Sequence, residues 1–402
     1  MKKIMIVVSI LLILGLFGYF GYQKYQEYLL EQRIKNAVIK IDLINPLEVE
    51  FNEKIYLSDL IKSINGKIMD DFLVDTSVVG EKKISFKYYH EDNLIVPYEF
   101  NVKIVDKTPP VIWLADTYTV NVGDNKNLEE MIMCGDNYDD YPKCFINGEY
   151  NLQKIGNYSL FYEAIDSSGN VTKHPFTLKV IQKKSNSSTK TSTIPFKSLY
   201  NEYKNDKTKI GIDVSRWQGD IDFEKVKQEG VEFVFIKVGG QNGIDGDYYI
   251  DPKFKRNIEG FMQVDIPVGL YFYSYANSEK KAYEDALWVM EQIKDYHITL
   301  PIAFDWENWG SFNKFHISFN TLTKMAKKFV NTLESKGYKG MLYSSKNYLE
   351  QIWLKNSLPI WLAHYTSKTD YGGEYKCWQR TSSAKISGIT VNTVDVDICY
   401  ER

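Results

Sequence analysis

The sequence contains few cysteines and histidines and has no excess of basic residues. Its 402 residues include four Cys and five His, and these form no Cys-x-x-Cys motif or Cys/His cluster of the kind that holds zinc. The 49 Lys and Arg residues are interspersed with 52 Asp and Glu residues, so no basic stripe suited to nucleic acid is present. We therefore expect neither a metal nor another cofactor, and no nucleic-acid partner.

Aromatic residues, by contrast, are plentiful, with 30 Tyr, 21 Phe and 8 Trp. Such a composition is typical of β-rich cores, and it also suits surfaces on which sugar rings stack. A chain of this length exceeds one ordinary core and indicates about two to four domains.

The N-terminus carries a long apolar run. Met1-Lys2-Lys3 precede the uncharged stretch Ile4–Tyr22, whose 19 residues suffice to cross a bilayer as a helix. A signal-peptide core is usually shorter, and no small-x-small cleavage site follows. We predict cytoplasmic residues 1–3, an uncleaved transmembrane signal anchor over 4–22 and a helical stalk over 23–40, with the remainder outside the cell. A cleaved signal is the alternative.

The four cysteines fit an external location, because disulfides persist in oxidising compartments. Cys134 and Cys144 bracket an acidic turn, and Cys377 and Cys399 lie near the end of the chain. We predict the sequence-local pairs Cys134–Cys144 and Cys377–Cys399 among three connectivities. Free buried thiols are the alternative.

Two related segments follow the stalk. Leu57 and Leu128 open similar motifs 71 positions apart, and Gly80 and Gly156 open similar strand patterns 76 positions apart. The extra residues of the second copy coincide with the cysteine-bracketed loop. Repeated strands of period two, separated by turn residues, predict two small β-sandwich modules.

The module boundaries are expected at 41–106 and 107–182, with a flexible linker rich in Ser, Thr, Lys and Asn over 183–208. The second module resembles bacterial surface immunoglobulin-like modules through Asp106-Lys107-Thr108-Pro109-Pro110 and the turn Asp166-Ser167-Ser168-Gly169-Asn170. We interpret that turn as capping its own backbone rather than binding calcium. Both modules are expected to be spacers or weak interaction modules.

From residue 209 onward strands and helices alternate, which predicts a closed β/α barrel with its site at the C-terminal ends of the strands. The segments 366–374 and 381–393 carry no helical period, so we expect a flattened, irregular barrel with an antiparallel strand near its end. Predicted strands are 209–214, 233–238, 267–273, 300–305, 340–343, 359–365, 375–380 and 394–400, and predicted helices are 224–229, 250–264, 278–296, 318–336 and 346–354.

The strand predicted over 300–305 ends in the motif Asp305-Trp306-Glu307. Side chains two positions apart on a strand point the same way, so this motif presents two carboxylates from one face. Two carboxyl groups in unlike environments are what the cleavage of a glycosidic bond requires.

Other predicted strands carry polar residues on one face. Asp213 alternates with apolar neighbours, Asp395 and Asp397 share a face, and Tyr271 and Tyr273 line one side of a third strand. Together with the Asp305 pair they predict an acidic cleft with tyrosine walls. The alternative is that such acids cap the helices that follow them.

These residues carry a resemblance to glycoside hydrolase family 25, the bacterial and phage-type lysozymes. It covers about 209–402 in the family's order, although Phe223 stands where Trp is more common. The matching segments are Gly211-Ile212-Asp213-Val214-Ser215-Arg216-Trp217-Gln218-Gly219, Phe235–Gly240, Gly269–Tyr273, Phe304–Glu307, Tyr343-Ser344, Ile360–Tyr365, Trp378-Gln379 and Val394–Asp397.

The resemblance implies cleavage of the β-1,4 bond between N-acetylmuramic acid and N-acetylglucosamine in peptidoglycan glycan strands. It implies Glu307 as proton donor, Asp305 as the second central carboxylate, and Asp213 and Asp395 as the rest of the acidic site. We also expect Asp305 and local burial to raise the proton affinity of Glu307. Expected substrate-binding residues are Tyr271, Tyr273, Tyr343, Trp361, Tyr365, Trp378, Gln379, Lys237, which pairs with cleft acids, and Asp397.

Two other functions remain open from the sequence. A chitinase-like glycosidase also uses acids spaced two apart, although Ala303 stands where that pattern has a further acid. The chain could instead be a catalytically silent wall-binding or adhesion protein. An anchored hydrolase would act within reach of its own membrane, in local wall remodelling or in opening a passage. Attack by a carboxylate, by water or by the substrate's acetamido group is equally compatible with the sequence.

Overall fold

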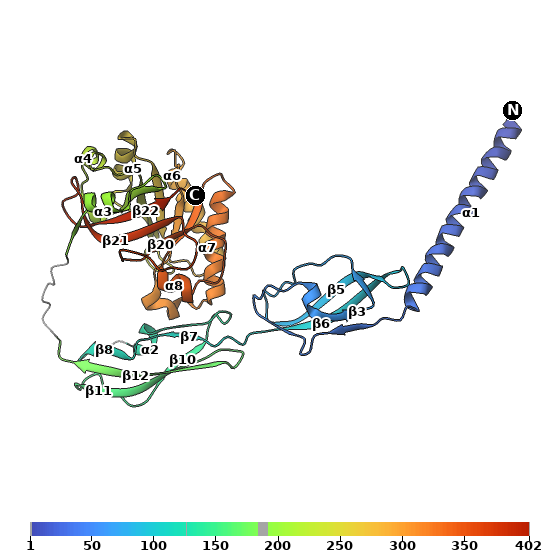
Figure 1. Ribbon diagram of the computed structural model, residues 1–402, viewed down its shortest axis with the longest axis horizontal. Helices are drawn as coiled ribbons and strands as arrows, with labels where there is room; N and C mark the ends of the chain where they lie inside the picture. Colours follow the sequence, from blue (N-terminus) through green and yellow to red (C-terminus); the bar gives the residue numbers. More distant parts are fainter. Residues whose placement is uncertain (1, 126, 184–191, 402) are drawn as a thin grey trace. The chain divides into compact units, whose positions relative to one another are not determined.

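The computed structural model describes residues 2–125, 127–183 and 192–401, with side chains described from residue 14 onward. The chain divides into two compact units, Met1–Lys107 and Thr108–Arg402. We describe each unit by itself (Figure 1).

The first unit begins with the helix α1 (Lys2–Lys35). The predicted span 4–22 falls in this helix, but the side chains of residues 4–13 lie outside the described part. Among the described residues, no helix combines the length and the apolar character needed to cross a bilayer. The membrane prediction therefore rests on the sequence alone.

The rest of the first unit is a module of two sheets. Its long hairpin alternates buried and exposed side chains, with Ile84, Phe86 and Tyr88 turned inward, as the period-two pattern predicts. The short 3₁₀ helix η1 (Leu57–Leu60) contributes two more buried leucines. The smaller sheet pairs β1 (Ile41–Leu43) with β3 (Ile61–Ile64), and the larger has the order β2 (Glu48–Glu50), β6 (Ile95–Val105), β5 (Gly80–His90), β4 (Gly66–Ile68).

The second unit opens with a module that repeats this plan, and we call residues 108–182 the second module. The disulfide Cys134–Cys144 joins β9 of one sheet to β10 of the other, and confirms that predicted pair. A short helix, α2 (Leu128–Met131), stands where η1 stands in the first unit. The larger sheet has the order β10 (Lys143–Asn147), β11 (Gly156–Ile165), β12 (Val171–Ile181), β8 (Thr117–Asn121), and β7 (Val111–Trp113) pairs with β9 (Met133–Gly135).

The predicted linker 183–208 is wrong in its C-terminal part. Residues 184–191 lie outside the described residues, but β13 (Ile194–Pro195) pairs with the barrel strand β21, and α3 (Phe196–Tyr203) follows directly. Phe196 and Leu199, three positions apart, are both buried on one face of α3. Their spacing supplies an apolar face amid polar residues, and it attaches the segment to the barrel.

The remainder of the second unit is the predicted β/α barrel. Its sheet has ten strands, and because β13 and β16 (Tyr248–Ile250) lie off the ring, eight strands remain to close it. The pairing of β21 with β22 closes the ring, and β22 runs antiparallel to both of its neighbours, as expected. The ring strands are β14 (Thr208–Val214), β15 (Val234–Gln241), β17 (Val268–Tyr273), β18 (Ile302–Asp305), β19 (Gly340–Ser345), β20 (Ile360–Ala363), β21 (Cys377–Lys385) and β22 (Val394–Tyr400).

Helices cover the outside of the ring (Figure 1). Apolar side chains fill its interior. Phe235, Ala303, Met341 and Trp361 belong to the cluster inside the ring, so the site must lie above this packing. The disulfide Cys377–Cys399 joins β21 to β22, and confirms the second predicted pair. The helices are α4 (Phe223–Gln228), α5 (Phe254–Gln263), α6 (Glu279–Ile293), α7 (Phe319–Glu334) and α8 (Lys346–Gln351), with the 3₁₀ helices η2 (Arg216–Gln218) and η3 (Trp309–Phe315).

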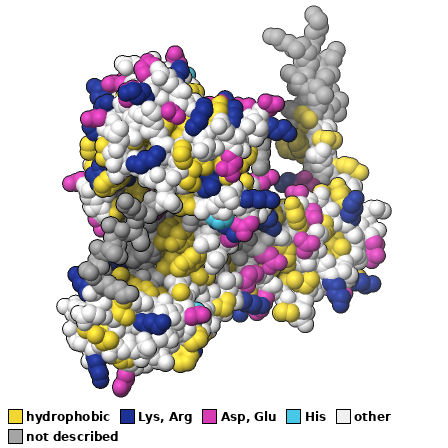
Figure 2. Space-filling view, turned by 60° about the vertical axis from the view of Figure 1, so that its left-hand side comes forward, with side chains coloured by type: hydrophobic (Ala, Val, Ile, Leu, Met, Phe, Trp, Pro, Cys, Tyr) yellow, Lys and Arg dark blue, Asp and Glu magenta, His cyan; other side chains and the backbone are white. Residues whose placement is uncertain are grey.

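Charged side chains are mixed over the surface. Figure 2 shows acidic and basic groups interspersed on the face in view, with no broad field of one sign. That distribution agrees with the balanced composition, and on this face it gives no electrostatic footprint for nucleic acid.

Candidate active site

Four predicted catalytic carboxylates meet at one end of the barrel. Asp213 and Asp305 lie at the C-terminal ends of the parallel strands β14 and β18. Asp395 lies near the start of β22, and because β22 is antiparallel, its beginning lies beside the end of β14, with Asp395 in register with Asp213. A cavity of about 200 Å³ lies over them, lined by Asp213, Tyr271, Asp305, Glu307, Tyr343, Trp361, Tyr365, Gln379 and Asp395.

Gln379 organises one wall of this cavity. Its Nε2 donates to Asp213 Oδ2 at 2.7 Å, which orients the carboxylate. Its Oε1 accepts from the hydroxyls of Tyr343 at 2.9 Å and Tyr365 at 3.0 Å. Both ends of one buried amide are therefore engaged, so the positions of an acid and two aromatic rings are coupled.

Burial disfavours the ionised form of Asp213. Burial raises its pKa well above the usual value, and the charges of Asp395 and Asp397 raise it further. Burial also raises the pKa of Asp395, to about 7. Neighbouring acids in a closed space cannot all ionise at neutral pH, so this group retains protons there.

Asp305 and Glu307 have unlike environments. Asp305 is buried at 3% exposure, and burial raises its pKa well above the usual value, with the charge and hydrogen bonding of Glu307 acting in the same direction. Glu307 lies past the end of β18 and is exposed. The expectation that local burial acts on Glu307 is therefore wrong, because its side chain is exposed although its neighbours Trp306 and Asn308 are buried.

Lys237 lies close to this pair. Its Nζ is 4.7 Å from the centroid of the Tyr273 ring, and its positive charge lowers the pKa of Asp305 against the effect of burial. Lys237 was expected to pair with cleft acids, and its positive charge acts on the carboxyl group of Asp305.

The predicted aromatic residues divide into a packed floor and an exposed ring. Trp361 is 1% exposed and stacks on Phe235 at 4.4 Å, with Tyr343 edge-on to it at 4.7 Å. Tyr271 also lines the cavity beside them. Tyr365 is 57% exposed, which leaves its ring available to a sugar.

Four predicted substrate-binding residues are not among those that line the cavity: Lys237 and Tyr273, which lie near Asp305, and Trp378 and Asp397. Trp378 packs on Tyr203 of α3, and its Nε1 donates to His364 O at 2.7 Å, outside the cavity. Its neighbour Gln379 points inward, so alternation along β21 turns Trp378 outward. Asp397 is fully buried and accepts from Trp361 Nε1 at 2.8 Å, beneath the lining residues. The assignments of Trp378 and Asp397 as substrate contacts are therefore wrong.

A second cavity, of about 460 Å³, extends the first and was missed from the sequence. It shares Glu307, Tyr343 and Tyr365 with the first cavity. Its walls include Trp309 and Tyr348, whose rings stack at 3.9 Å. Trp309 could have been found from the sequence, because it follows Glu307 by two positions. Tyr348 could not, because it belongs to α8, which is distant in the sequence. The cavity also takes in Ser344, Ser345, Lys346, Asn347, Ala363 and His364.

Comparison with known proteins agrees with this geometry. Residues 212–389 match the family model described as Glycosyl hydrolases family 25. The chain is similar to an autolytic lysozyme of Clostridium acetobutylicum, with 28% identity over 191 residues, covering 46% of this chain and 54% of that protein. It is also similar to the uncharacterized protein YegX of Escherichia coli, with 27% identity over 189 residues, 44% of this chain and 65% of that one.

Among solved structures, a family 25 glycosyl hydrolase from Bacillus anthracis aligns with 22% identity and a TM-score of 0.42, covering 54% of this chain and 96% of that one. The chain spans about half the length of the autolytic lysozyme it matches. Residues 212–389 of this chain therefore form a glycoside hydrolase domain of family 25, the lysozyme family.

Proposed function

We propose that the barrel hydrolyses the β-1,4 bond between N-acetylmuramic acid and N-acetylglucosamine in peptidoglycan. The observation that carries this proposal is the exposed Glu307 beside the buried, proton-retaining Asp305, at the edge of a cavity that Asp213 and Asp395 also line. Exposure gives Glu307 access to a polymeric substrate, and the paired acid keeps a proton available at neutral pH. The similarity to a protein named as an autolytic lysozyme supports the same substrate.

The proposed reaction begins with proton transfer from Glu307 to the glycosidic oxygen as the bond to the anomeric carbon breaks. The hydrogen-bonded Asp305 keeps the shared proton on the pair until that moment. Positive charge then develops on the sugar ring, next to the carboxyls of Asp213 and Asp395. The group retains some of its protons, and a carboxylate that is already ionised in this partly closed cavity stabilises that charge more strongly than in water. Water finally supplies the hydroxyl group to the anomeric carbon, directly or through an intermediate, and its proton returns to Glu307, which completes the hydrolysis.

The decisive experiment is mass spectrometry of fragments released from purified peptidoglycan by the full chain. A muramidase leaves N-acetylmuramic acid at the new reducing end. Fragments that end in N-acetylglucosamine would refute the assignment. Release of sugars from chitin instead of peptidoglycan would favour the chitinase-like alternative. Binding to walls without any new reducing ends would favour the silent wall-binding alternative.

We further propose that the enzyme works outside the cytoplasm, held at the membrane by residues 4–22. The two disulfides support an oxidising compartment. The uncharged run at the N-terminus supports the anchor. The two β-rich modules, which we propose to be immunoglobulin-like, lie between the anchor and the barrel in the sequence, and hydrolysis serves local wall remodelling or passage. Recovery of the intact chain in the soluble fraction after lysis would contradict the anchor.

A further inference from the structure

The second module contacts the segment that follows Glu307. The side-chain amide of Asn313, in η3, uses both of its ends in this contact. Its Oδ1 accepts from Cys134 N at 2.9 Å, and its Nδ2 donates to Glu129 O and Ile132 O, both at 3.0 Å. Three hydrogen bonds from one half-buried side chain fix the distance and the orientation of η3 against the module.

The loop between the cysteines of the second module adds a second set of contacts. Asp140 Oδ1 accepts from Ser318 N at 2.6 Å and from Thr321 Oγ1 at 2.9 Å. These two groups belong to the first turn of α7, where a negative charge is favourable. The backbone of the loop also accepts from the helix start, since Asp136 O binds Phe319 N at 2.8 Å.

Close packing accompanies these hydrogen bonds. Gly135 lies against two rings of the barrel, and a Cβ added there would approach Phe319 to 2.6 Å and Phe312 to 2.7 Å. The neighbouring residue Met133 belongs to the main apolar core of the barrel. The position therefore requires glycine because of the approach of the barrel, rather than because of an unusual backbone angle.

An aromatic series continues from the module into the substrate cavity. The ring of Trp113, on β7, lies 4.8 Å from that of Tyr348, and Tyr348 stacks on Trp309 at 3.9 Å. Tyr348 and Trp309 both line the cavity that contains Glu307. The module thus contacts Tyr348, one wall of the cavity, which in turn stacks on Trp309.

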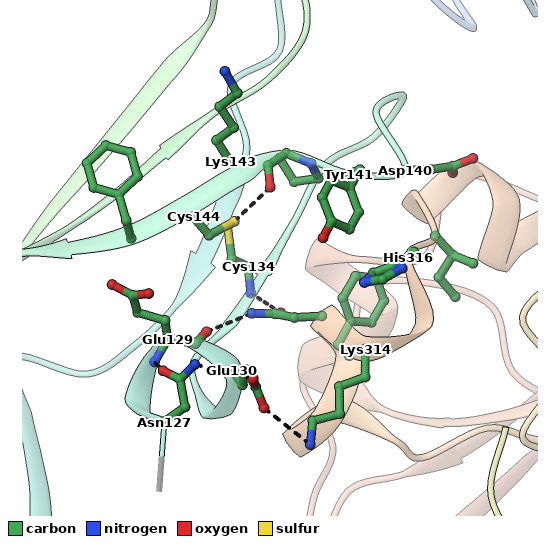
Figure 3. A pocket seen from close by; sticks show the side chains of 15 residues that line it. Asn127, Glu129, Glu130, Cys134, Asp140, Tyr141, Lys143, Cys144, Lys314 and His316 are labelled. Atoms are coloured by element: carbon green, nitrogen blue, oxygen red, sulfur yellow. Dashed lines mark hydrogen bonds and ion pairs between the residues drawn. A yellow bond between two sulfur atoms is a disulfide. The ribbon is translucent and has the colours of Figure 1, made fainter.

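An open groove of about 710 Å³ lies beside these contacts (Figure 3). Across it, Glu130 and Lys314 point toward one another and form an ion pair at 3.4 Å, and the Tyr141 ring lies edge-on to His316 at 4.4 Å. These rim groups are exposed, so their contribution to docking is small. The Asn313 hydrogen bonds, the contacts of Asp136 and Asp140 with α7, and the packing at Gly135 hold the two parts together.

We propose that the second module is a working part of the hydrolase and that Asn313 is a positioning residue for the Glu307 segment. This inference rests on the proposed function of the same site. Glu307 lies outside the strand ladder, and η3 behind it is a short 3₁₀ helix with non-helical torsion angles at Ser311. Trp306 Nε1 and Asn308 Nδ2 donate to Ala276 O and Ser274 O and hold the start of this segment on the barrel, and the docking of η3 onto the module holds its other end. Small displacements of a catalytic group can cost about a hundredfold in rate.

The test compares Asn313→Ala and Gly135→Ala with Gly156→Ala in the full chain. Asn313→Ala removes the three hydrogen bonds, and Gly135→Ala inserts a methyl group into the contact. At Gly156, in the same module, a Cβ would lie at 3.5 Å from Tyr158, an ordinary contact, so this variant is the matched control. We expect kcat on soluble glycan fragments to fall tenfold or more in both interface variants, with KM changing less than threefold, while the control stays within twofold.

Hydrogen exchange at the η3 amides reports whether the contact has opened. Faster exchange with an unchanged kcat would overturn the inference, because the module would then be a passive attachment. Should either variant fold poorly, Asp140→Ala, at an exposed position, is measured in its place because it removes the acceptor for Ser318 N and Thr321 Oγ1, and an unchanged kcat together with faster exchange there overturns the inference in the same way. Absence of activity in the wild-type chain would refute the proposed function instead, so the two failures are distinguishable.

Discussion

Asp213 and Asp395 are register partners on β14 and β22, and β22 runs antiparallel to both of its neighbours in the ring. An antiparallel strand brings its beginning to the end of the barrel where the parallel strands terminate. The reversal of β22 thus places a carboxyl at the site from a segment nearly two hundred residues away from its partner. The antiparallel strand β22, which makes this barrel irregular, therefore supplies Asp395, one of the two acids of the pair.

Replacement of Glu307 by Gln is expected to abolish most of the activity without affecting the fold. The amide cannot transfer a proton, and loss of general acid catalysis removes about 10²- to 10⁴-fold in rate. Release of reducing ends from peptidoglycan and the thermal unfolding temperature measure the two effects. The exposed Glu224→Gln, on α4, is the control and should behave as wild type. Wild-type rates for Glu307→Gln would remove Glu307 from the reaction.

Replacement of Asp395 by Asn is expected to change how stability depends on pH. The folded pKa of Asp395 is raised to about 7, above that of an unfolded Asp, so its contribution is fully present below about pH 4 and is lost as pH rises through about 7. Each pH unit in that window costs up to about 1.4 kcal/mol. Thermal unfolding between pH 4 and 8 should therefore be flatter for the variant than for wild type. The exposed Asp206→Asn should retain the wild-type slope, and an identical slope for Asp395→Asn would contradict the assignment.

Replacement of Gln379 by Leu is expected to lower both stability and kcat. The change removes the donor to Asp213 and the acceptor shared by Tyr343 and Tyr365. A buried polar group left without its partner costs about 1–3 kcal/mol. Denaturant unfolding and initial rates measure the two losses. The same substitution at the exposed Gln351 should leave both unchanged. Full activity of Gln379→Leu would show that the orientation of Asp213 does not matter to the reaction.

Replacement of Tyr365 is expected to change KM, whereas replacement of Trp378 is expected to change stability. Tyr365→Ala removes an exposed ring at the cavity and should raise KM severalfold, since stacking of a sugar on an aromatic ring is lost. Trp378→Phe removes a hydrogen bond to His364 O inside the protein and should lower the unfolding temperature with KM unchanged. Substrate titrations and thermal unfolding separate the two. A raised KM for Trp378→Phe together with an unchanged KM for Tyr365→Ala would identify Trp378 as a substrate contact.

Alternation along strands was enough to predict most of the barrel and its acids. The strands ending at Asp213 and Asp305 appear where the apolar pattern places them, and both disulfides join the predicted cysteines. The same alternation, applied strictly, would have turned Trp378 away from the site, since Gln379 and Trp378 cannot share a face. The burial of Asp305 in place of Glu307 depends on where the strand ends, which sequence patterns locate only to within a few residues.

The contact between the second module and the barrel could not be predicted. Its residues are short-range turn formers such as Asp136 and Asp140, whose local patterns suggest only a loop. Their partners are Phe319 and Ser318 of α7, and Ser318 lies 178 positions further along the chain than Asp140. No periodic pattern links segments at that distance, so only the folded chain reveals that they touch.

The loop that docks on the barrel is closed into a ring by Cys134 and Cys144, which are ten positions apart. An open chain would lose more conformational entropy than this ring when it orders against α7. Thiol oxidation and docking therefore favour one another. The module is therefore expected to bind the barrel more weakly when the two cysteines are reduced than when they are bonded.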